Sequence, residues 1–169
     1  SSKGMQKYLQ KLHPTCFEDL VILNCMYRPG PMEYISTLVR QKHSKKAVKY
    51  IIPCMEKYLH NTYGIIVYQE QIMMLSRLIA NFDRGESDLL RKALGKKKMD
   101  VLSVLKLRFI QGGIKNGHKK NALEKVWNEM EAKGMYAFQK SHAVCYTWLA
   151  YQIAYLKANY PDEFKQALE

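Results

Sequence analysis

Residues 61–82, NTYGIIVYQEQIMMLSRLIANF, decide the fold class because two competing periodicities meet in them. The first half holds a run with high strand propensity, long enough for one brief strand: Ile65, Ile66, Val67 and Tyr68. In the second half, apolar residues recur at the three- and four-residue spacing of a helix: Ile72, Leu75, Ile79 and Phe82. This stretch therefore predicts a helix from Gln69 onward, preceded by at most a short strand near 65–68.

Helix signals continue towards the N-terminus. The tetrapeptide Thr15-Cys16-Phe17-Glu18 matches a capping box, in which the threonine hydroxyl and the glutamate carboxylate each accept a backbone N–H. The helix that it starts, FEDLVILNCMY, is apolar on most sides and is expected to be buried. The prolines and glycine of Arg28–Pro31 must end it, and a second helix, PMEYISTLVRQKH, is predicted to begin on Pro31.

Further helices are predicted towards the C-terminus. Ser87 or Gly85 is expected to cap the helix that contains DLLRKALG. A later helix ends at Gly134 and carries an apolar stripe of Leu123, Val126, Trp127 and Met130. The last long helix is predicted to start after Ser141, a suitable N-cap, and to run to Asn159 before a short final turn of helix.

Composition and pattern bound the class of protein. No repeat or linker interrupts the helical patterns, so the sequence predicts one all-α domain over residues 1–169. Apolar residues make up 47% of the chain, which argues against disorder, and no apolar run approaches the roughly 20 residues of a membrane helix. The N-terminus, SSKGMQKYLQ, has no signal region and no initiator methionine, so we expect a piece of a longer, cytoplasmic polypeptide. The scattered cysteines are expected to be reduced thiols, and no structural metal is predicted.

Positive charge is concentrated in residues 84–120. The chain has 27 Lys+Arg against 15 Asp+Glu, and this stretch holds eleven cations and three acids, two thirds of the net charge of +12. An excess this local favours a polyanionic partner, first of all nucleic acid or nucleotide phosphate. A membrane surface is less favoured, because the stretch lies inside a globular pattern and not on an isolated amphipathic helix.

The centre of the basic region is DLLRKALGKKK, residues 88–98. On a helix, Arg91 and Lys92 point away from a core-facing arc formed by Leu89, Leu90, Ala93 and Leu94. Gly95 is expected to end the helix and to leave three consecutive lysines on the following turn. One interpretation is a solvated helix end whose cations complement the macrodipole. The other is a phosphate-binding surface, favoured because few acids lie nearby and a second basic segment follows.

A second candidate site is Met135–His142, MYAFQKSH, at the start of the last long helix. Tyr136 and Phe138 could stack on a base, and the helix N-terminus offers free N–H groups to an anion. The alternative is two core aromatics beside a capped helix. No catalytic residue is predicted, because the five aspartates form no D-x-D or D-x-x-D pair for two-metal chemistry.

Four stretches, in this order and spacing, resemble the fingers domain of the bacterial replicative DNA polymerase, the alpha subunit of DNA polymerase III: YRPGPMEYI, TYGIIVYQEQIM, DLLRKALGKKK and FQKSHAVCYTWLAYQIAYLKANYPDEF. The resemblance covers nearly the whole chain. It implies a mainly helical domain that helps bind the incoming deoxynucleoside triphosphate (dNTP) and template–primer DNA in a DNA-directed DNA polymerase, a nucleotidyltransferase. It also implies that the catalytic aspartates and Mg²⁺ belong to a palm domain outside this chain. The piece alone is therefore expected to be inactive and to bind no cofactor.

The resemblance also implies roles for individual residues. Arg91 and Lys92 match an arginine pair that contacts the triphosphate, although a lysine cannot repeat the bidentate contact of an arginine. Lys140 and His142 are implied to belong to the same triphosphate site, and Tyr136 to lie near the nascent base pair. Contact with the DNA backbone is expected for Lys96, Lys97 and Lys98.

This sequence departs from the family pattern where Met135 and Ala137 replace two glycines and Gln139 replaces an asparagine, so the loop is expected to differ locally. Two other interpretations stay open. One is a free-standing basic nucleic-acid-binding module, and the other is an assembly domain that docks the replicase on partner subunits through an apolar patch. A piece of a polymerase should itself expose apolar surface where the palm packs. Arg28 is undecided between the polar rim of the core and the DNA.

Overall fold

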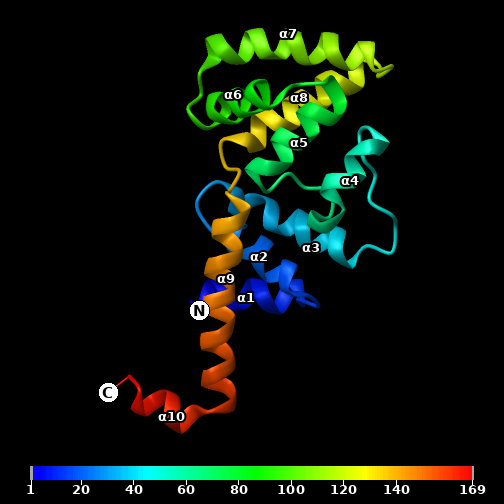
Figure 1. Cartoon of the computed structure of the whole chain (residues 1–169). Helices are drawn as coiled ribbons and strands as arrows, with labels where there is room; N and C mark the ends of the chain where they lie inside the picture. Colours follow the sequence, from blue (N-terminus) through cyan, green and yellow to red (C-terminus); the bar gives the residue numbers. More distant parts are fainter. Residues whose placement is uncertain (1, 169) are drawn as a thin grey trace.

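The computed structural model describes residues 2–168, which form helices joined by turns and one long loop, with no sheet among them (Figure 1). The predicted all-α class is confirmed. The elements are α1 (Lys3–Leu12), α2 (Phe17–Met26), η1 (Pro31–Tyr34), α3 (Ile35–His43), η2 (Pro53–Met55), α4 (Glu56–Leu59), η3 (His60–Thr62), α5 (Gln69–Ala80), α6 (Arg84–Gly95), α7 (Met99–Lys115), α8 (Lys120–Gly134), α9 (Lys140–Asn159) and α10 (Pro161–Gln166), where η marks a 3₁₀ turn.

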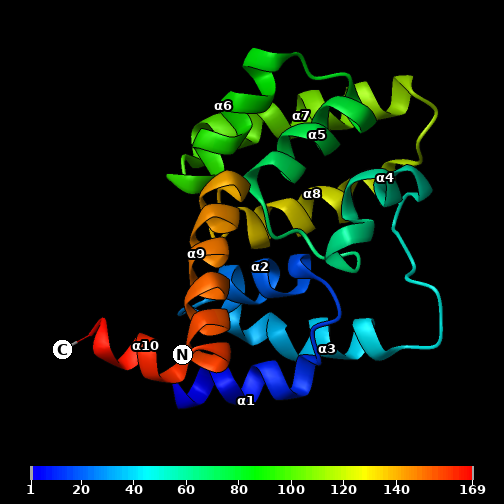
Figure 2. The same cartoon turned by 60° about the horizontal axis from the view of Figure 1, so that its bottom comes forward.

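Two lobes are stacked in this structure. Helices α1, α2 and α3 form the lower lobe in Figure 1, and α5, α6, α7 and α8 form the upper lobe. Each lobe has its own cluster of buried apolar side chains. Helix α9 begins at the junction of the lobes and packs against α2 (Figure 2). In Figure 1 its second half extends past α1, away from both lobes.

The lower lobe is built around α2. Val21, Ile22 and Leu23 are all fully buried, which explains why this helix is apolar on nearly every side. The helix ends at Met26, before the Arg28–Pro31 turn, and η1 then begins on proline and leads into α3, as predicted.

The four cysteines of the chain are unpaired, and burial raises the pKa of the Cys25 thiol in α2 to about 12.

The upper lobe is closed by α7, a helix that we did not predict individually. Two glycines let α7 approach its neighbours: a Cβ on Gly112 would lie 2.1 Å from the Ala80 carbonyl oxygen, and a Cβ on Gly113 would lie 2.3 Å from Leu123. The predicted stripe of α8 is confirmed, because its four residues are at most 1% exposed: Leu123, Val126, Trp127 and Met130. The predicted ends of α6 at Gly95 and of α8 at Gly134 are also confirmed.

Two helix starts differ from the prediction. In α2 the N-cap is Cys16, and Asp19, not Glu18, accepts the backbone N–H groups of Thr15 and Cys16. Helix α6 starts one turn earlier than expected. Its N-cap Asp83 accepts the N–H of Glu86 at 2.7 Å while the Glu86 carboxylate accepts the N–H of Asp83 at 2.9 Å. This reciprocal pair is itself a capping box, so the expected caps Gly85 and Ser87 lie inside the helix.

The second half of α9 has no covering layer in the described residues. From residue 148 to residue 160 every side chain is exposed. The large apolar residues on this stretch are Trp148, Leu149, Tyr151, Ile153, Tyr155, Leu156 and Tyr160. The expectation of an exposed apolar surface is therefore confirmed. No helix within residues 2–168 has the length and hydropathy needed to cross a membrane.

A buried ion pair ties α2 to α3. Lys42 donates to Asp19 Oδ2 at 2.7 Å, and Tyr63 donates to Asp19 Oδ1 at 2.7 Å. The side chains of Asp19 and Lys42 are 1% and 7% exposed. Burial alone would raise the pKa of Asp19, but hydrogen bonds from Lys42, Thr15 and Tyr63 outweigh it and hold that pKa well below its usual range.

We predict that Asp19→Asn lowers the free energy of unfolding by about 3–5 kcal/mol at pH 7, because Lys42 keeps a buried charge without its partner. The folded-state pKa of Asp19 is depressed, so the stability that its carboxylate contributes is present above about pH 4 and is lost as pH falls towards the folded-state pKa. Urea unfolding should therefore show a gap between wild type and variant that narrows by about 1 kcal/mol from pH 7 to pH 3. A gap that stays constant over this range contradicts the assignment.

The control for this variant is Asp100→Asn, which removes an exposed carboxylate from the first turn of α7. It should cost about 0.3–1 kcal/mol, the usual value of a charge at a helix N-terminus.

Candidate functional site

Two chain segments cross between the lobes side by side. Phe138 N–H donates to the Val67 carbonyl at 2.9 Å, and Gln69 N–H donates to the Phe138 carbonyl at 2.9 Å. These bonds make one isolated parallel bridge between Tyr68 and Phe138. Of the short strand that the sequence allowed near 65–68, only this bridge forms, because α5 begins at Gln69, immediately after the single paired residue, and leaves no length for a ladder.

Residues 65–68 form the crossover segment between the lobes, and the directions of their side chains still alternate as in a strand. Ile65 and Val67 are buried in the cluster of the lower lobe, whereas Ile66 is buried in the cluster of the upper lobe. Successive side chains of an extended segment point to opposite sides, so a short β-branched run can join two helical cores.

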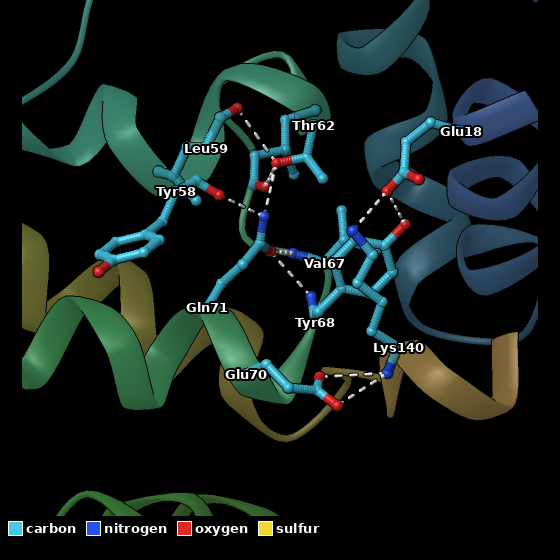
Figure 3. Close-up of polar contacts among 10 residues, drawn as sticks. Glu18, Tyr58, Leu59, Thr62, Val67, Tyr68, Glu70, Gln71 and Lys140 are labelled. Atoms are coloured by element: carbon cyan, nitrogen blue, oxygen red, sulfur yellow. Dashed lines mark hydrogen bonds and ion pairs between the residues drawn. The ribbon is translucent and has the colours of Figure 1, made fainter. Parts of the chain in front are cut away.

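The side chain of Gln71 holds the backbone of Val67 and Tyr68 by hydrogen bonds, as Figure 3 shows. Its side-chain oxygen accepts the N–H groups of Val67 at 2.8 Å and Tyr68 at 2.9 Å. Its side-chain nitrogen donates to the Tyr58 carbonyl at 3.0 Å and to Thr62 Oγ1 at 2.8 Å. The side chain is buried, so the first two bonds satisfy two backbone donors that water cannot reach, and the other two satisfy the amide of Gln71 itself.

Two acidic side chains, Glu70 on α5 and Glu18 on α2, contact Lys140, the first residue of α9. Both carboxylate oxygens of Glu70 accept the Lys140 N–H, at 3.1 Å each. The Lys140 ammonium lies 3.1 Å from Glu18, which also accepts a hydrogen bond from the Tyr68 hydroxyl at 3.1 Å (Figure 3). The prediction of Ser141 as N-cap is wrong, because a carboxylate on α5 satisfies the helix start and Ser141 lies in the first turn.

The cations of α6 share one acid. Arg91 donates from Nε and Nη2 to Asp88 Oδ1, at 2.9 and 2.7 Å, and Lys92 lies 2.7 Å from Asp88 Oδ2. The hydrogen bonds of Lys92 and Arg91 lower the pKa of the Asp88 carboxyl. Of the few acids expected near this run, Asp88 lies one turn away on the same helix and pairs with both cations.

Gln69 connects Arg91 to the loop before α9. Arg91 Nη1 donates to the Gln69 side-chain oxygen at 3.3 Å, and the Gln69 side-chain nitrogen donates to the Ala137 carbonyl at 3.2 Å. The structure thus joins the cationic helix and the Met135–Phe138 loop, two candidate sites that are far apart in sequence.

The predicted core-facing arc of α6 is wrong at Leu89, whose side chain is 46% exposed. The other three residues of the arc are buried in the core: Leu90, Ala93 and Leu94.

The lysine run forms the turn between α6 and α7. Lys96 is the C-cap of α6, Lys97 has a left-handed φ of 52°, and Lys98 precedes α7. All three side chains are exposed. They extend the basic surface from Arg91 to the edge of the upper lobe.

The aromatic residues near α9 lie on two sides of the loop. The Tyr136 ring packs against Gly30, whereas the His142 ring lies between Phe138 and Tyr146 in tilted contacts, with ring centroids 5.5 and 5.3 Å apart. Tyr146 is 63% exposed. Of the predicted residues, Lys140 lines an open groove of about 210 Å³ beside the crossover, and Arg91 lies outside it.

The contacts of Arg28 within this chain lie at the polar rim of the core, one of the two alternatives left open by the sequence. Arg28 Nε donates to the Cys25 carbonyl at 2.7 Å, Nη2 donates to the Tyr136 carbonyl, and the guanidinium carbon lies 4.5 Å from the Phe138 ring centroid. It therefore fastens the end of α2 to the loop before α9. Sequence reasoning also missed the roles of Gln69, Glu70 and Gln71, although all three fall in the quoted stretch TYGIIVYQEQ.

The fold defines an all-α domain of two lobes, in which Gln69 links the cationic helix α6 to the loop before α9. The chain belongs to the family described as the bacterial DNA polymerase III alpha subunit finger domain, whose model matches residues 1–117. The resemblance of the quoted motifs to that family is thereby confirmed.

Relatives extend the similarity over the C-terminal part. A DNA polymerase III subunit alpha from Aquifex aeolicus is 44% identical over 165 residues, which cover 96% of this chain and 14% of that protein. One from Halalkalibacterium halodurans is 45% identical over 167 residues, covering 99% and 15%, and one from Borreliella burgdorferi is 43% identical over 166 residues, covering 98% and 14%. The chain thus spans about one seventh of the length of these relatives.

We predict that Gln71→Met lowers the free energy of unfolding by about 3 kcal/mol, because the buried N–H groups of Val67 and Tyr68 lose their acceptor. Methionine keeps nearly the same length and volume, so the loss reports the hydrogen bonds. Urea unfolding of the chain measures it. The matched control is Gln41→Met, because the buried side-chain oxygen of Gln41 has no partner in residues 2–168. Equal losses for the two variants would refute the role of Gln71.

Proposed function

We propose that residues 1–169 act as the fingers of a replicative DNA polymerase and bind the triphosphate of the incoming dNTP together with template–primer DNA. The observation that carries this proposal is the link from Arg91 through Gln69 to the Ala137 carbonyl. It supports a single binding face made of α6, the Met135–Phe138 loop and the first turn of α9.

Arg91 has the geometry of a phosphate ligand. Asp88 and Gln69 accept three of its N–H groups, and a guanidinium has five, so two remain for phosphate oxygens. The same contacts fix the plane of the guanidinium before a nucleotide arrives, which reduces the entropy lost on binding. Arg91 then stabilises the negative charge that develops on the leaving pyrophosphate.

The lysines contribute charge with less directionality. The Lys92 side chain is 58% exposed and the Lys140 side chain is 40% exposed, and each pairs with a single acid. Exposed ion pairs of this kind are worth about 0–1 kcal/mol, so a triphosphate can replace Asp88 or Glu18 as the partner. His142 lies in the first turn of α9 and adds a donor to the same face.

Tyr136 is proposed to lie at the nascent base pair, and Lys96, Lys97 and Lys98 to follow the DNA backbone independently of sequence. The described residues do not fit a role as Mg²⁺ ligands, because no group of three or more His, Cys, Asp or Glu lies close enough to hold a metal ion. The carboxylates that hold Mg²⁺ in the polymerase are therefore proposed to come from the rest of the polypeptide. The whole polymerase is proposed to work in the cytoplasm.

The exposed apolar face of α9 is proposed to pack against the palm and other domains of the same polypeptide. The large side chains on this helix, from Trp148 to Tyr160, would leave more apolar surface in water than a free-standing domain usually carries. This favours a part of a larger chain over a free-standing nucleic-acid-binding module.

We predict that Arg91→Ala in the full-length polymerase lowers kcat/KM for dNTP incorporation by about 100-fold or more, a loss of about 2.7 kcal/mol of transition-state stabilisation. The affinity for primer–template should stay unchanged. Single-nucleotide primer extension and a DNA-binding titration measure the two quantities.

The matched control is Arg84→Ala, which removes an exposed arginine from the other end of α6 and should leave incorporation within about twofold of wild type. If Arg91→Ala weakens only DNA binding, and more so at high salt, α6 contacts the duplex backbone and the triphosphate is held elsewhere.

A further inference from the structure

The Arg28–Pro31 turn touches the Met135–Phe138 loop at three separate points. Arg28 Nη2 donates to the Tyr136 carbonyl. Its guanidinium carbon lies 4.5 Å from the Phe138 ring centroid. The third contact is made by Gly30, against the Tyr136 ring itself. The turn and the loop are 108 residues apart in the chain, so this arrangement is a tertiary one.

Gly30 leaves no room for a side chain against the Tyr136 ring. Its φ is 95°, a conformation that disfavours other residues, and a Cβ there would lie 2.4 Å from Tyr136 Cε1. The ring therefore occupies the space that any larger residue would need. Gly30 and Tyr136 each restrict the other.

Arg28 fixes the backbone of the same loop at the Tyr136 carbonyl. Its Nε holds the Cys25 carbonyl at 2.7 Å, one of the last carbonyls of α2, and so the arginine is anchored on a fully packed helix. A planar fork can hold two carbonyls while stacking on the Phe138 ring, and an ammonium cannot do all three.

We propose that Arg28 and Gly30 are positioning residues that set the place of the Tyr136 ring and, through it, the discrimination between correct and mismatched dNTP. The inference rests on the proposed function of Tyr136 at the nascent base pair. Neither residue needs to touch the nucleotide, because both contacts end on the loop. A turn in the lower lobe thereby controls the geometry of a binding face that otherwise belongs to α6 and α9.

The test uses the full-length polymerase and compares kcat and KM for single correct and mismatched dNTP insertions. The ratio of the two kcat/KM values should fall by about tenfold or more in Arg28→Ala and in Gly30→Ala, since displacements near 1 Å at a reacting centre cost that much. Arg28→Lys should recover part of the loss, because it keeps one donor near the Tyr136 carbonyl.

Gly117→Ala is the matched control for backbone strain. Gly117 also has a positive φ, of 82°, but nothing lies within 4 Å of a Cβ built on it. This variant should lose thermal stability as Gly30→Ala does and keep the selectivity of wild type. If it loses selectivity as much as Gly30→Ala does, the effect is one of general destabilisation and the inference is overturned.

Tyr136→Ala separates the inference from the function on which it rests. If Tyr136→Ala incorporates correct and mismatched dNTP as wild type does, the proposed role of Tyr136 fails. If it loses selectivity while Arg28→Ala and Gly30→Ala keep theirs, the role stands and the positioning inference fails.

A double variant keeps the test decisive where Gly30→Ala lowers stability. With the ring removed, Gly30→Ala has nothing to displace, so Gly30→Ala/Tyr136→Ala should match Tyr136→Ala in selectivity. A further tenfold loss in the double variant would show that Gly30 acts by another route.

Discussion

Two hydrogen bonds between the segment at Val67–Gln69 and Phe138 hold the candidate site together. Each is worth about 1 kcal/mol, so the pairing alone would not fix one lobe on the other. Its strength comes from what surrounds it. Ile66 is buried in the core of the upper lobe, and Val67 is buried in the core of the lower lobe. The side-chain oxygen of Gln71 accepts the N–H groups of Val67 and Tyr68. Because Gln69 and Lys140 flank this bridge, any shift of the lobes would move Arg91 and α9 relative to each other.

The charges of the site are organised by acids. Asp88 orients Arg91 and Lys92, and Glu18 holds Lys140. These partly exposed pairs add little stability, and their effect is to fix where the cations point before an anion binds. The buried pair of Asp19 and Lys42 is different, because it is removed from water and its loss would destabilise the lower lobe. The same types of residue thus serve binding in one place and folding in another, and burial decides between them.

Local periodicity predicts much of the fold, and long-range contacts explain what it cannot predict. The stripe of α8 and the end of α6 at Gly95 follow from spacing within one helix, and both are confirmed. The start of α9 does not follow from local spacing, because the N–H of its first residue donates to the Glu70 carboxylate, 70 residues earlier in the chain. The partner of Arg28 is likewise hidden from sequence reasoning. For the site, the candidate residues could be chosen from motifs, whereas the side chains that orient them became visible only when the lobes were placed together.

The most direct measurement is a cryo-electron microscopy structure of the full-length polymerase with primer–template and a non-hydrolysable dNTP. The account predicts triphosphate oxygens within about 3 Å of Arg91 Nη and Lys140 Nζ. It also predicts that Phe138 stays paired with Val67 and Gln69. A triphosphate bound away from α6 and α9, or a bound state in which this bridge is broken, would contradict the account.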